Sequence, residues 1–258
     1  MPHLLLNIRR AETPGYARLK RIVITLLRVH IPIPELSKPM LRTMYTFHWW
    51  VARAYRRFCV LFYAEPLFRG RCDRVGERLF LWVLPDIRGH THIEIGDDVS
   101  ISGKIGVASG RTHEHPRLVI GNKVTIGSNV GFVVNQEVVI EDGARIGADC
   151  SVRDSDSHPL DFRPRLAGAP AFASEIRPVR ICRNAWIGAG STICKGVTIG
   201  EGAIIGSRSV VMTDIPPYAR AVGNPARVLV NPGPPKSDFI APVPDSWVPQ
   251  YAPPRAAN

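Results

Sequence analysis

The feature that most constrains this chain is a six-residue repeat between Ile181 and Pro216. An aliphatic residue returns at every sixth position, and a small or branched residue follows it four places later. The first set is Ile181, Ile187, Ile193, Ile199, Ile205 and Val211, and the second is Ala185, Ser191, Val197, Ala203, Ser209 and Ile215. A period of six matches neither the 3.6 residues of a helix nor the two residues of a strand.

This period fits a chain that coils around a triangular prism with three short strands per coil. Each strand then pairs with the same strand of the next coil, about 4.8 Å away. Glycine follows the aliphatic residue at Gly188, Gly200 and Gly206, where a tight bend leaves little room for a side chain. We therefore predict a mainly β fold, the left-handed parallel β-helix. Ordinary strands of a β-sandwich would not keep one phase over six units.

Weaker copies of the repeat lie upstream, at Ile95, Ile101, Val107, Ile120, Ile126, Phe132, Ile140, Ile146 and Val152. Two excursions, 108–117 and 158–178, interrupt the phase and should lie outside the coil. Three repeats per coil predict about five coils. We thus expect a basic amphipathic helical region and transition at 1–86, a β-helix domain at 87–230, and a proline-rich tail at 231–258.

The positive charge lies in the N-terminal third. Residues 1–90 hold 16 Lys and Arg against 6 Asp and Glu, whereas residues 91–258 hold 17 against 16. Apolar periodicity predicts helices at 16–29 and at 37–63. Aromatic and basic residues together indicate contact with an anionic membrane surface through residues 16–63. Packing on the coil or on a neighbouring subunit is the alternative. No nucleic-acid recognition motif accompanies the charge.

The composition suits a reducing compartment. Five cysteines are scattered without metal-ligand spacing or an even disulfide framework. No uncharged apolar run approaches the roughly 18 residues of a spanning helix. We expect a cytoplasmic protein, peripheral to the inner face of the membrane if residues 16–63 bind lipid.

The order of the motifs carries a family resemblance. A His-Pro at the root of a long loop is followed by WIGAG, GVTIGEGAIIGSRSVV, PPY and GNPAR. This order resembles the hexapeptide-repeat acyltransferases of the maltose/galactoside O-acetyltransferase type, over roughly residues 90–230. It is also similar to the sugar O-acetyltransferases of surface-polysaccharide pathways. The resemblance implies acetyl-CoA as co-substrate, no metal, and a homotrimer whose active sites are shared between adjacent prisms.

The resemblance puts the catalytic histidine at His158, within DSDSHP. Acetyl transfer to a hydroxyl requires a base, and imidazole suits that role near neutral pH. Alternate residues of an extended segment share a face, so Asp154 and Asp156 should point the same way as His158. We expect Asp156 to orient the imidazole and Asp154 to bind sugar hydroxyls. A metal site or a solvated acidic loop would use the same residues.

For the acetyl donor, the resemblance implies a cleft along the coils. Trp186 would flank the pantetheine arm, and the backbone at Ala189 and Ser207 would bond its amides. Arg227, in GNPAR, would meet a CoA phosphate. The alternatives are an exposed coil tryptophan and a surface arginine.

The chain departs from the family pattern close to this cleft. It has Ser-Arg-Ser at 207–209 where the family commonly has Ala-Gly-Ser, and Met-Thr at 212–213 in place of Thr-Lys. One expected phosphate contact is thereby lost, and we hypothesise that Arg208 replaces its charge.

The acceptor is a sugar or glycolipid by resemblance only. Asn129 and Asn135 fall near positions where the family contacts sugar, although asparagine also forms structural ladders at bends. His113 and His115 in the first excursion line the same cleft or belong to a surface loop. Which sugar is acetylated, and the length of the acyl chain, stay open.

Four other functions compete with O-acetylation. N-acetylation of an amino sugar would use the same base, and a serine acetyltransferase-like enzyme would have a long helical N-terminal domain that is not evident. A non-catalytic membrane-docking trimeric scaffold would not need the motifs above. A β-helical carbonic anhydrase needs three histidines for zinc, and residues 118–216 contain only His158.

Overall fold

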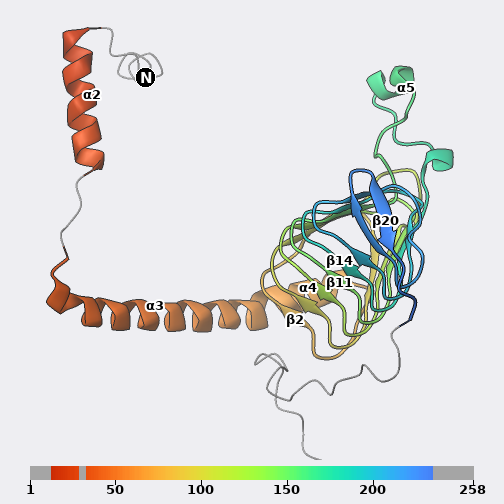
Figure 1. Ribbon diagram of the computed structural model, residues 1–258, viewed down its shortest axis with the longest axis horizontal. Coiled ribbons are helices and arrows are strands. Elements are labelled where there is room, and N and C mark those ends of the chain that lie inside the picture. Colours follow the sequence, from red (N-terminus) through yellow and green to blue (C-terminus); the bar gives the residue numbers. More distant parts are fainter. Residues whose placement is uncertain (1–12, 29–32, 235–258) are drawn as a thin grey trace, which may run out of the picture. The chain divides into compact units, whose positions relative to one another are not determined.

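A computed structural model describes residues 13–28 and 33–234 of the chain (Figure 1). The chain divides into two compact units, Met1–Ala54 and Tyr55–Asn258, and each is described by itself. Of the predicted proline-rich tail, residues 235–258 lie outside the described residues.

The first unit contains the predicted N-terminal helices. Helix α2 spans Pro14–Leu27, and the hydroxyl of Thr13 accepts a hydrogen bond from the backbone N–H of Tyr16 at its start. A short 3₁₀ helix, η1 (Glu35–Ser37), leads into α3 (Lys38–Cys59), which continues into the second unit. No helix in the described ranges is long and apolar enough to cross a membrane.

The chain stays helical further than the predicted end near residue 63. A π-helical turn, η2 (Val60–Ala64), is followed by α4 (Glu65–Arg71). Pro66 stands in the first turn of α4, where its missing N–H costs no helical hydrogen bond. Val60 and Phe68 are buried in the same apolar cluster as Leu81 of the first coil. This helical segment therefore covers the start of the β-helix.

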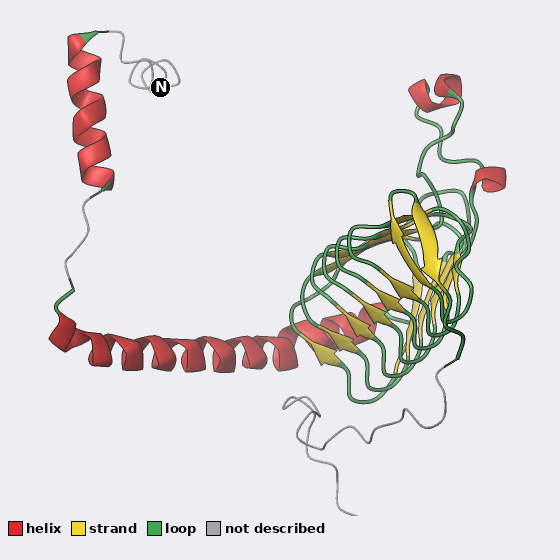
Figure 2. Ribbon diagram, in the orientation of Figure 1, coloured by secondary structure: helices red, strands yellow, loops and turns green. Residues whose placement is uncertain are grey.

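The second unit is a parallel β-helix built of three sheets (Figure 2). The first sheet contains β1 (Arg74–Val75), β4 (His92–Ile95), β7 (Arg117–Ile120), β10 (Glu137–Ile140), β13 (Val179–Ile181) and β16 (Thr198–Ile199). The second contains β2 (Phe80–Leu81), β5 (Ser100–Ile101), β8 (Thr125–Ile126), β11 (Arg145–Ile146), β14 (Trp186–Ile187), β17 (Ile204–Ile205), β19 (Arg220–Gly223) and β20 (Ala226–Val230). The third contains β3 (Asp86–Arg88), β6 (Ile105–Ala108), β9 (Val130–Val133), β12 (Ser151–Arg153), β15 (Thr192–Ile193) and β18 (Val210–Val211). All pairs are parallel except β19 with β20.

The six-residue repeat forms the core as predicted. Its aliphatic residues stack in register from coil to coil, with Ile140 paired to Ile181 and Ile181 paired to Ile199. The smaller residues of the repeat fill the remaining inward positions, and Ala185 and Ser191 are completely buried. The column therefore removes one continuous apolar surface from water.

The β-helix is longer than predicted. The first and third sheets each hold six strands, which gives six coils within the described residues, where about five were expected. The first coil begins at Arg74 and not near Ile87, because β1 pairs with β4 and β2 pairs with β5. Val75, Leu81 and Ile87 keep the six-residue spacing. The predicted boundary at residue 87 is therefore corrected to residue 74.

Three edges run along the prism, and each gathers one kind of bend. Edge 1 joins the first sheet to the second, and edge 2 joins the second sheet to the third. Edge 3 joins the third sheet to the first-sheet strand of the next coil. Both excursions leave from edge 3, after β6 and after β12. The second carries α5 (Phe162–Leu166) and η3 (Ala173–Glu175) on an arm that projects from the coils (Figure 1).

Close stacking of bends generates a prediction for glycine. A Cβ added at Gly127 would lie 2.5 Å from the backbone N of Ala148, whereas one added at Gly131 meets nothing within 4 Å. Gly127→Ala should lower the free energy of unfolding by about 1–3 kcal/mol through overpacking. Gly131→Ala, the matched control, should change it little. Urea unfolding followed by circular dichroism measures both, and equal losses would contradict the stacking argument.

Candidate active site

His158 lies at the root of the arm, exposed, on edge 3. Asp156, two residues earlier, is exposed too, and its Oδ2 accepts a hydrogen bond from the Lys195 ammonium at 2.6 Å. No hydrogen bond joins Asp156 to His158 among the described residues. Lys195 follows β15, so the pair joins the arm to the next coil. Lys195 could not be predicted from the sequence, because an isolated lysine at an outward position of the repeat gives no signal.

Asp154 does not share a face with His158, and the predicted sugar contact is corrected. Its side chain is completely buried. Its carboxylate accepts hydrogen bonds from the backbone N–H groups of Asn135, Gln136 and Glu137, at 2.6–2.9 Å. Strand β12 ends at Arg153, so the period of two on which the prediction rested stops before Asp154. Burial raises the pKa of this carboxyl, and the backbone donors oppose that rise.

The two asparagines differ from each other in exposure. Asn135 is buried on edge 3, and its Oδ1 accepts a hydrogen bond from the backbone N–H of Gly110. It therefore has a structural role, and its predicted sugar contact is corrected as well. Asn129 is exposed on edge 2 at a positive φ of 57°, and its Nδ2 donates to Asp149 of the next coil at 3.2 Å. It thus forms the ladder expected as the alternative.

The first excursion lies against the arm. The Thr112 hydroxyl donates to the carbonyl oxygen of Ala171 at 2.6 Å. The rings of His115 and His92 lie 5.4 Å apart between centroids, tilted by 55° to each other. The Nε2 atom of His113 is buried without a hydrogen-bond partner among the described residues. His113 and His115 thus belong to edge 3, beside the arm.

Side-chain caps satisfy the backbone amides at the first three bends of edge 1. The backbone N–H of Glu77 donates to the Asp97 carboxylate, that of Asp97 to the Asn122 side chain, and that of Asn122 to the Asp142 carboxylate, each at 2.7–2.8 Å. Each cap comes from the following coil. Where this ladder ends, the Glu141 carboxylate accepts from the N–H of Arg183 at 3.1 Å.

Edge 2 has no such caps at the corresponding bends. Its bends have the sequences Gly-Ala-Gly at 188–190 and Gly-Ser-Arg at 206–208. None of these side chains accepts a hydrogen bond from a backbone N–H of the adjacent bend in the described chain. The backbone N–H groups of Ala189 and Ser207 have no acceptor among the described residues, and both residues are exposed. Backbone donors free at a surface are ready to bind a ligand. Edge 2 therefore offers free backbone donors that a ligand could bind.

The remaining predicted donor residues lie along the same edge. Trp186, on the outer face of β14, is 53% exposed and precedes the bend that contains Ala189. Arg208 occupies a positive φ of 59°, and its side chain runs back over Gly190 of the preceding coil. Arg227 pairs with Val222, which packs over Gly206 beyond the last full coil. Edge 2 thus carries an exposed aromatic ring, two free amides and two arginines. We call this row the donor line: Trp186, Ala189, Ser207, Arg208 and Arg227.

A single chain does not bring His158 together with this line. The arm leaves from edge 3, whereas Ala189 and Ser207 lie on edge 2, and the third sheet separates the two edges. The predicted site residues therefore form two groups on opposite borders of that sheet.

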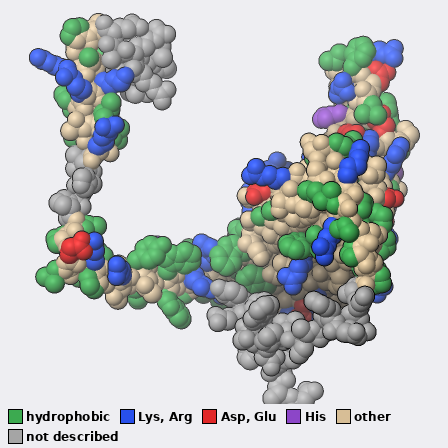
Figure 3. Space-filling model, viewed as in Figure 1, with side chains coloured by type: hydrophobic (Ala, Val, Ile, Leu, Met, Phe, Trp, Pro, Cys, Tyr) green, Lys and Arg blue, Asp and Glu red, His purple; other side chains and the backbone are tan. Residues whose placement is uncertain are grey.

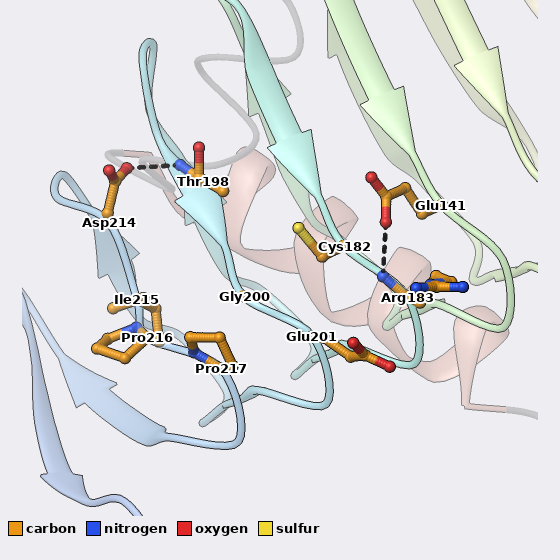
Figure 4. A pocket seen from close by; sticks show the side chains of 10 residues that line it. All are labelled: Glu141, Cys182, Arg183, Thr198, Gly200, Glu201, Asp214, Ile215, Pro216 and Pro217. Carbon is orange, nitrogen blue, oxygen red and sulfur yellow. Dashed lines mark hydrogen bonds between the residues drawn. The ribbon is translucent and has the colours of Figure 1, made fainter. Parts of the chain in front are cut away.

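A hollow of about 430 Å³ lies on edge 1, away from both groups (Figure 4). Glu141, Arg183 and Asp214 border it, and its amides at Arg183 and Thr198 already donate to carboxylates. It contains none of the predicted site residues. In the described ranges, moreover, no three His, Cys, Asp or Glu side chains form a group that could hold a metal ion.

Comparison with known families and proteins supports the resemblance read from the sequence. Residues 178–212 match the family model described as bacterial transferase hexapeptide, six repeats. A Schizosaccharomyces pombe protein is 38% identical over 43% of this chain and 42% of its own length. A Staphylococcus aureus protein is 38% identical over 42% of this chain and 55% of its own length. Both are named "putative acetyltransferase", and the chain spans about half the length of each.

A solved structure shows the same fold. It is a mutant of the N-acyltransferase AntD from Bacillus cereus, in complex with dTDP and coenzyme A, and it aligns with a TM-score of 0.51 at 22% identity. The alignment covers 65% of this chain and 88% of that one. The similarity to hexapeptide-repeat acyltransferases, predicted from the motifs, is thus confirmed.

The different environments of the two aspartates give a prediction. Asp154→Ala should lower the free energy of unfolding by about 2–4 kcal/mol, because three backbone donors lose their acceptor inside the coil. Asp156→Ala removes only a partly exposed ion pair and should cost less than about 1 kcal/mol. Urea unfolding of the two variants provides the comparison. A larger loss for Asp156→Ala would contradict these assignments.

Proposed function

We propose that this chain is an acetyl-CoA-dependent O-acetyltransferase that acts on a sugar hydroxyl, in the synthesis of a surface polysaccharide or glycolipid. The observation that carries the proposal is the line along edge 2, where unpartnered amides are bordered by an exposed tryptophan and two arginines. The relatives named as acetyltransferases support the same activity.

In this proposal edge 2 binds the donor. The N–H groups of Ala189 and Ser207 would donate to amide carbonyls of the pantetheine arm, and the Trp186 ring would cover one side of it. Arg227 and Arg208 would contact CoA phosphates, for which arginine is well suited because its guanidinium donates in a fixed fork. Arg208 would supply the charge that the Met-Thr pair at 212–213 lacks.

His158 would act as general base. Its imidazole takes the proton of the acceptor hydroxyl as the oxygen attacks the thioester carbonyl carbon. The tetrahedral oxyanion is stabilised by backbone N–H donors, and it collapses with cleavage of the C–S bond. The imidazolium then returns its proton to the CoA thiolate, which leaves acetate esterified to the sugar. Asp156, already paired with Lys195, would orient the imidazole.

The reaction requires a second copy of the chain. His158 leaves from edge 3 and the donor line follows edge 2, so one chain alone presents the base and the thioester on different borders of the third sheet. A second prism that sets its edge 3 beside this edge 2 would complete the site. We propose the homotrimer on this ground and on the family resemblance.

The acceptor would bind where the two edges meet. Asn129 is the predicted acceptor residue that stays exposed, and it lies on edge 2. The same base would serve an amine, so amino sugars are competing acceptors.

Donor binding provides the first test of this proposal. Calorimetric titration with acetyl-CoA should give saturable binding, weakened about tenfold by Trp186→Ala, Arg208→Ala and Arg227→Ala, a loss of roughly 1.4 kcal/mol each. Arg183→Ala, an exposed arginine on edge 1, is the matched control and should bind normally. No binding by the folded wild-type protein would overturn the enzyme proposal and favour a scaffold.

Catalysis by His158 provides the second test. Release of the CoA thiol is measured with a panel of sugars, amino sugars and serine as acceptors. His158→Asn should lower kcat by about 10²–10⁴-fold with donor affinity unchanged, because only the proton acceptor is lost. His48→Asn, in α3, controls for the loss of an exposed histidine. Full activity of His158→Asn would contradict its role, and turnover with amino sugars alone would replace O-acetylation by N-acetylation.

A further inference from the structure

The two N-terminal helices leave large apolar side chains exposed. No residue of α2 or α3 is buried. Large apolar side chains stand in water along both, including Leu27 at 80%, Trp50 at 74% and Phe47 at 69% exposure. Most helical stability in proteins comes from burial of an apolar face, and α2, with 14 residues, has a length that is marginal for an isolated helix in water. Both helices therefore require a surface to cover them.

The charges of this segment are almost all positive. Neither α2 nor α3 contains an acidic residue, and between residues 13 and 59 the described ranges hold Glu35 alone as an acid (Figure 3). The basic residues in the same ranges are Arg18, Lys20, Arg21, Arg28, Lys38, Arg42, Arg53, Arg56 and Arg57. A uniformly basic segment favours a negatively charged partner.

The apolar and basic residues of α3 fall on opposite faces. At 100° per residue, Met44, Phe47 and Val51 lie on one face, to which Met40 and Phe58 also belong. Lys38, Arg42 and Arg53 lie on the opposite face. Trp50 falls between the two, at the border where a ring that is apolar but carries an N–H suits a membrane interface.

Helix α2 shows the same combination. Leu19, Val23 and Leu26 lie on one stripe, and Arg18 and Lys20 fall at its two borders. Basic side chains in such border positions can extend toward lipid headgroups while the apolar stripe enters the acyl region. Helices α2 and α3 thus both combine an apolar face with basic residues beside or opposite it.

We propose that α2 and α3 dock this protein on an anionic lipid surface, with both helices lying in the headgroup region. The apolar faces enter the membrane, and the basic residues contact anionic headgroups. A second copy of the chain fits less well, because self-association would bring together basic helices that carry no acid to balance them. The proposal is independent of the acetyltransferase assignment.

The full chain would be sedimented with vesicles of phosphatidylcholine alone, and of phosphatidylcholine mixed with an equal part of phosphatidylglycerol, at low and high salt. Binding is expected only to the mixed vesicles and should weaken with salt. The variant Arg18→Gln/Arg21→Gln/Arg42→Gln/Arg57→Gln should lower the partition coefficient by at least ~100-fold, since each basic residue contributes roughly fivefold near an anionic leaflet. Arg56 is left intact, because its guanidinium lies 4.7 Å from the ring centroid of Trp82.

Two further variants separate the contributions. Phe47→Ser/Val51→Ser keeps every charge and should also lose binding. Arg111→Gln/Lys123→Gln removes exposed charge from the second unit and should bind as the wild type does. Equal binding to neutral vesicles would overturn the proposal. It would also be overturned by absence of vesicle binding together with a fall in oligomer mass for Phe47→Ser/Val51→Ser, because the partner would then be a second copy.

Discussion

The in-register stacking of successive coils is the interaction on which the rest of this structure depends. Parallel strands pair with the same strand of the next coil, so every sixth side chain meets its counterpart inside the prism. The bends must stack as closely as the strands do. At Gly127 and Gly188 the backbone of the next coil stands where a Cβ would be, at 2.5 Å from the nearest nitrogen. Each edge thereby becomes a column of equivalent backbone groups.

The columns differ in whether side chains accept hydrogen bonds from their backbone N–H groups. On edge 1, Asp97, Asn122 and Asp142 cap the amides of preceding bends. On edge 2, alanine and serine occupy the corresponding places and leave the N–H groups of Ala189 and Ser207 without acceptors in the described chain. The choice of residues at a bend therefore decides which backbone amides stay free. The fold aligns the backbone N–H groups along each edge, and the local sequence decides whether side chains cap them.

The sequence predicted the repetitive parts of this molecule well, because a strict six-residue period has one structural explanation. The predicted start of the first coil, residue 87, lies C-terminal to the observed start at Arg74. Val75 and Leu81 gave no signal because the residues around them do not follow the six-residue repeat. The sequence also assigned Asp154 and Asn135 to a sugar, when both are buried among backbone groups. That error has a physical cause: alternation predicts which face a residue takes only while the strand lasts, and β12 ends at Arg153. Contacts between distant segments, such as that of Lys195 with Asp156, leave no local pattern.

We propose that the free amides of edge 2 bind the acetyl donor. Hydrogen–deuterium exchange of the full chain, with and without saturating acetyl-CoA, tests it directly, because a bonded amide exchanges more slowly. We expect slower exchange of the amides of Ala189 and Ser207, with no change at Asp97 and Asn122 on edge 1. Protection on edge 1, or none on edge 2 when acetyl-CoA is bound, would contradict it.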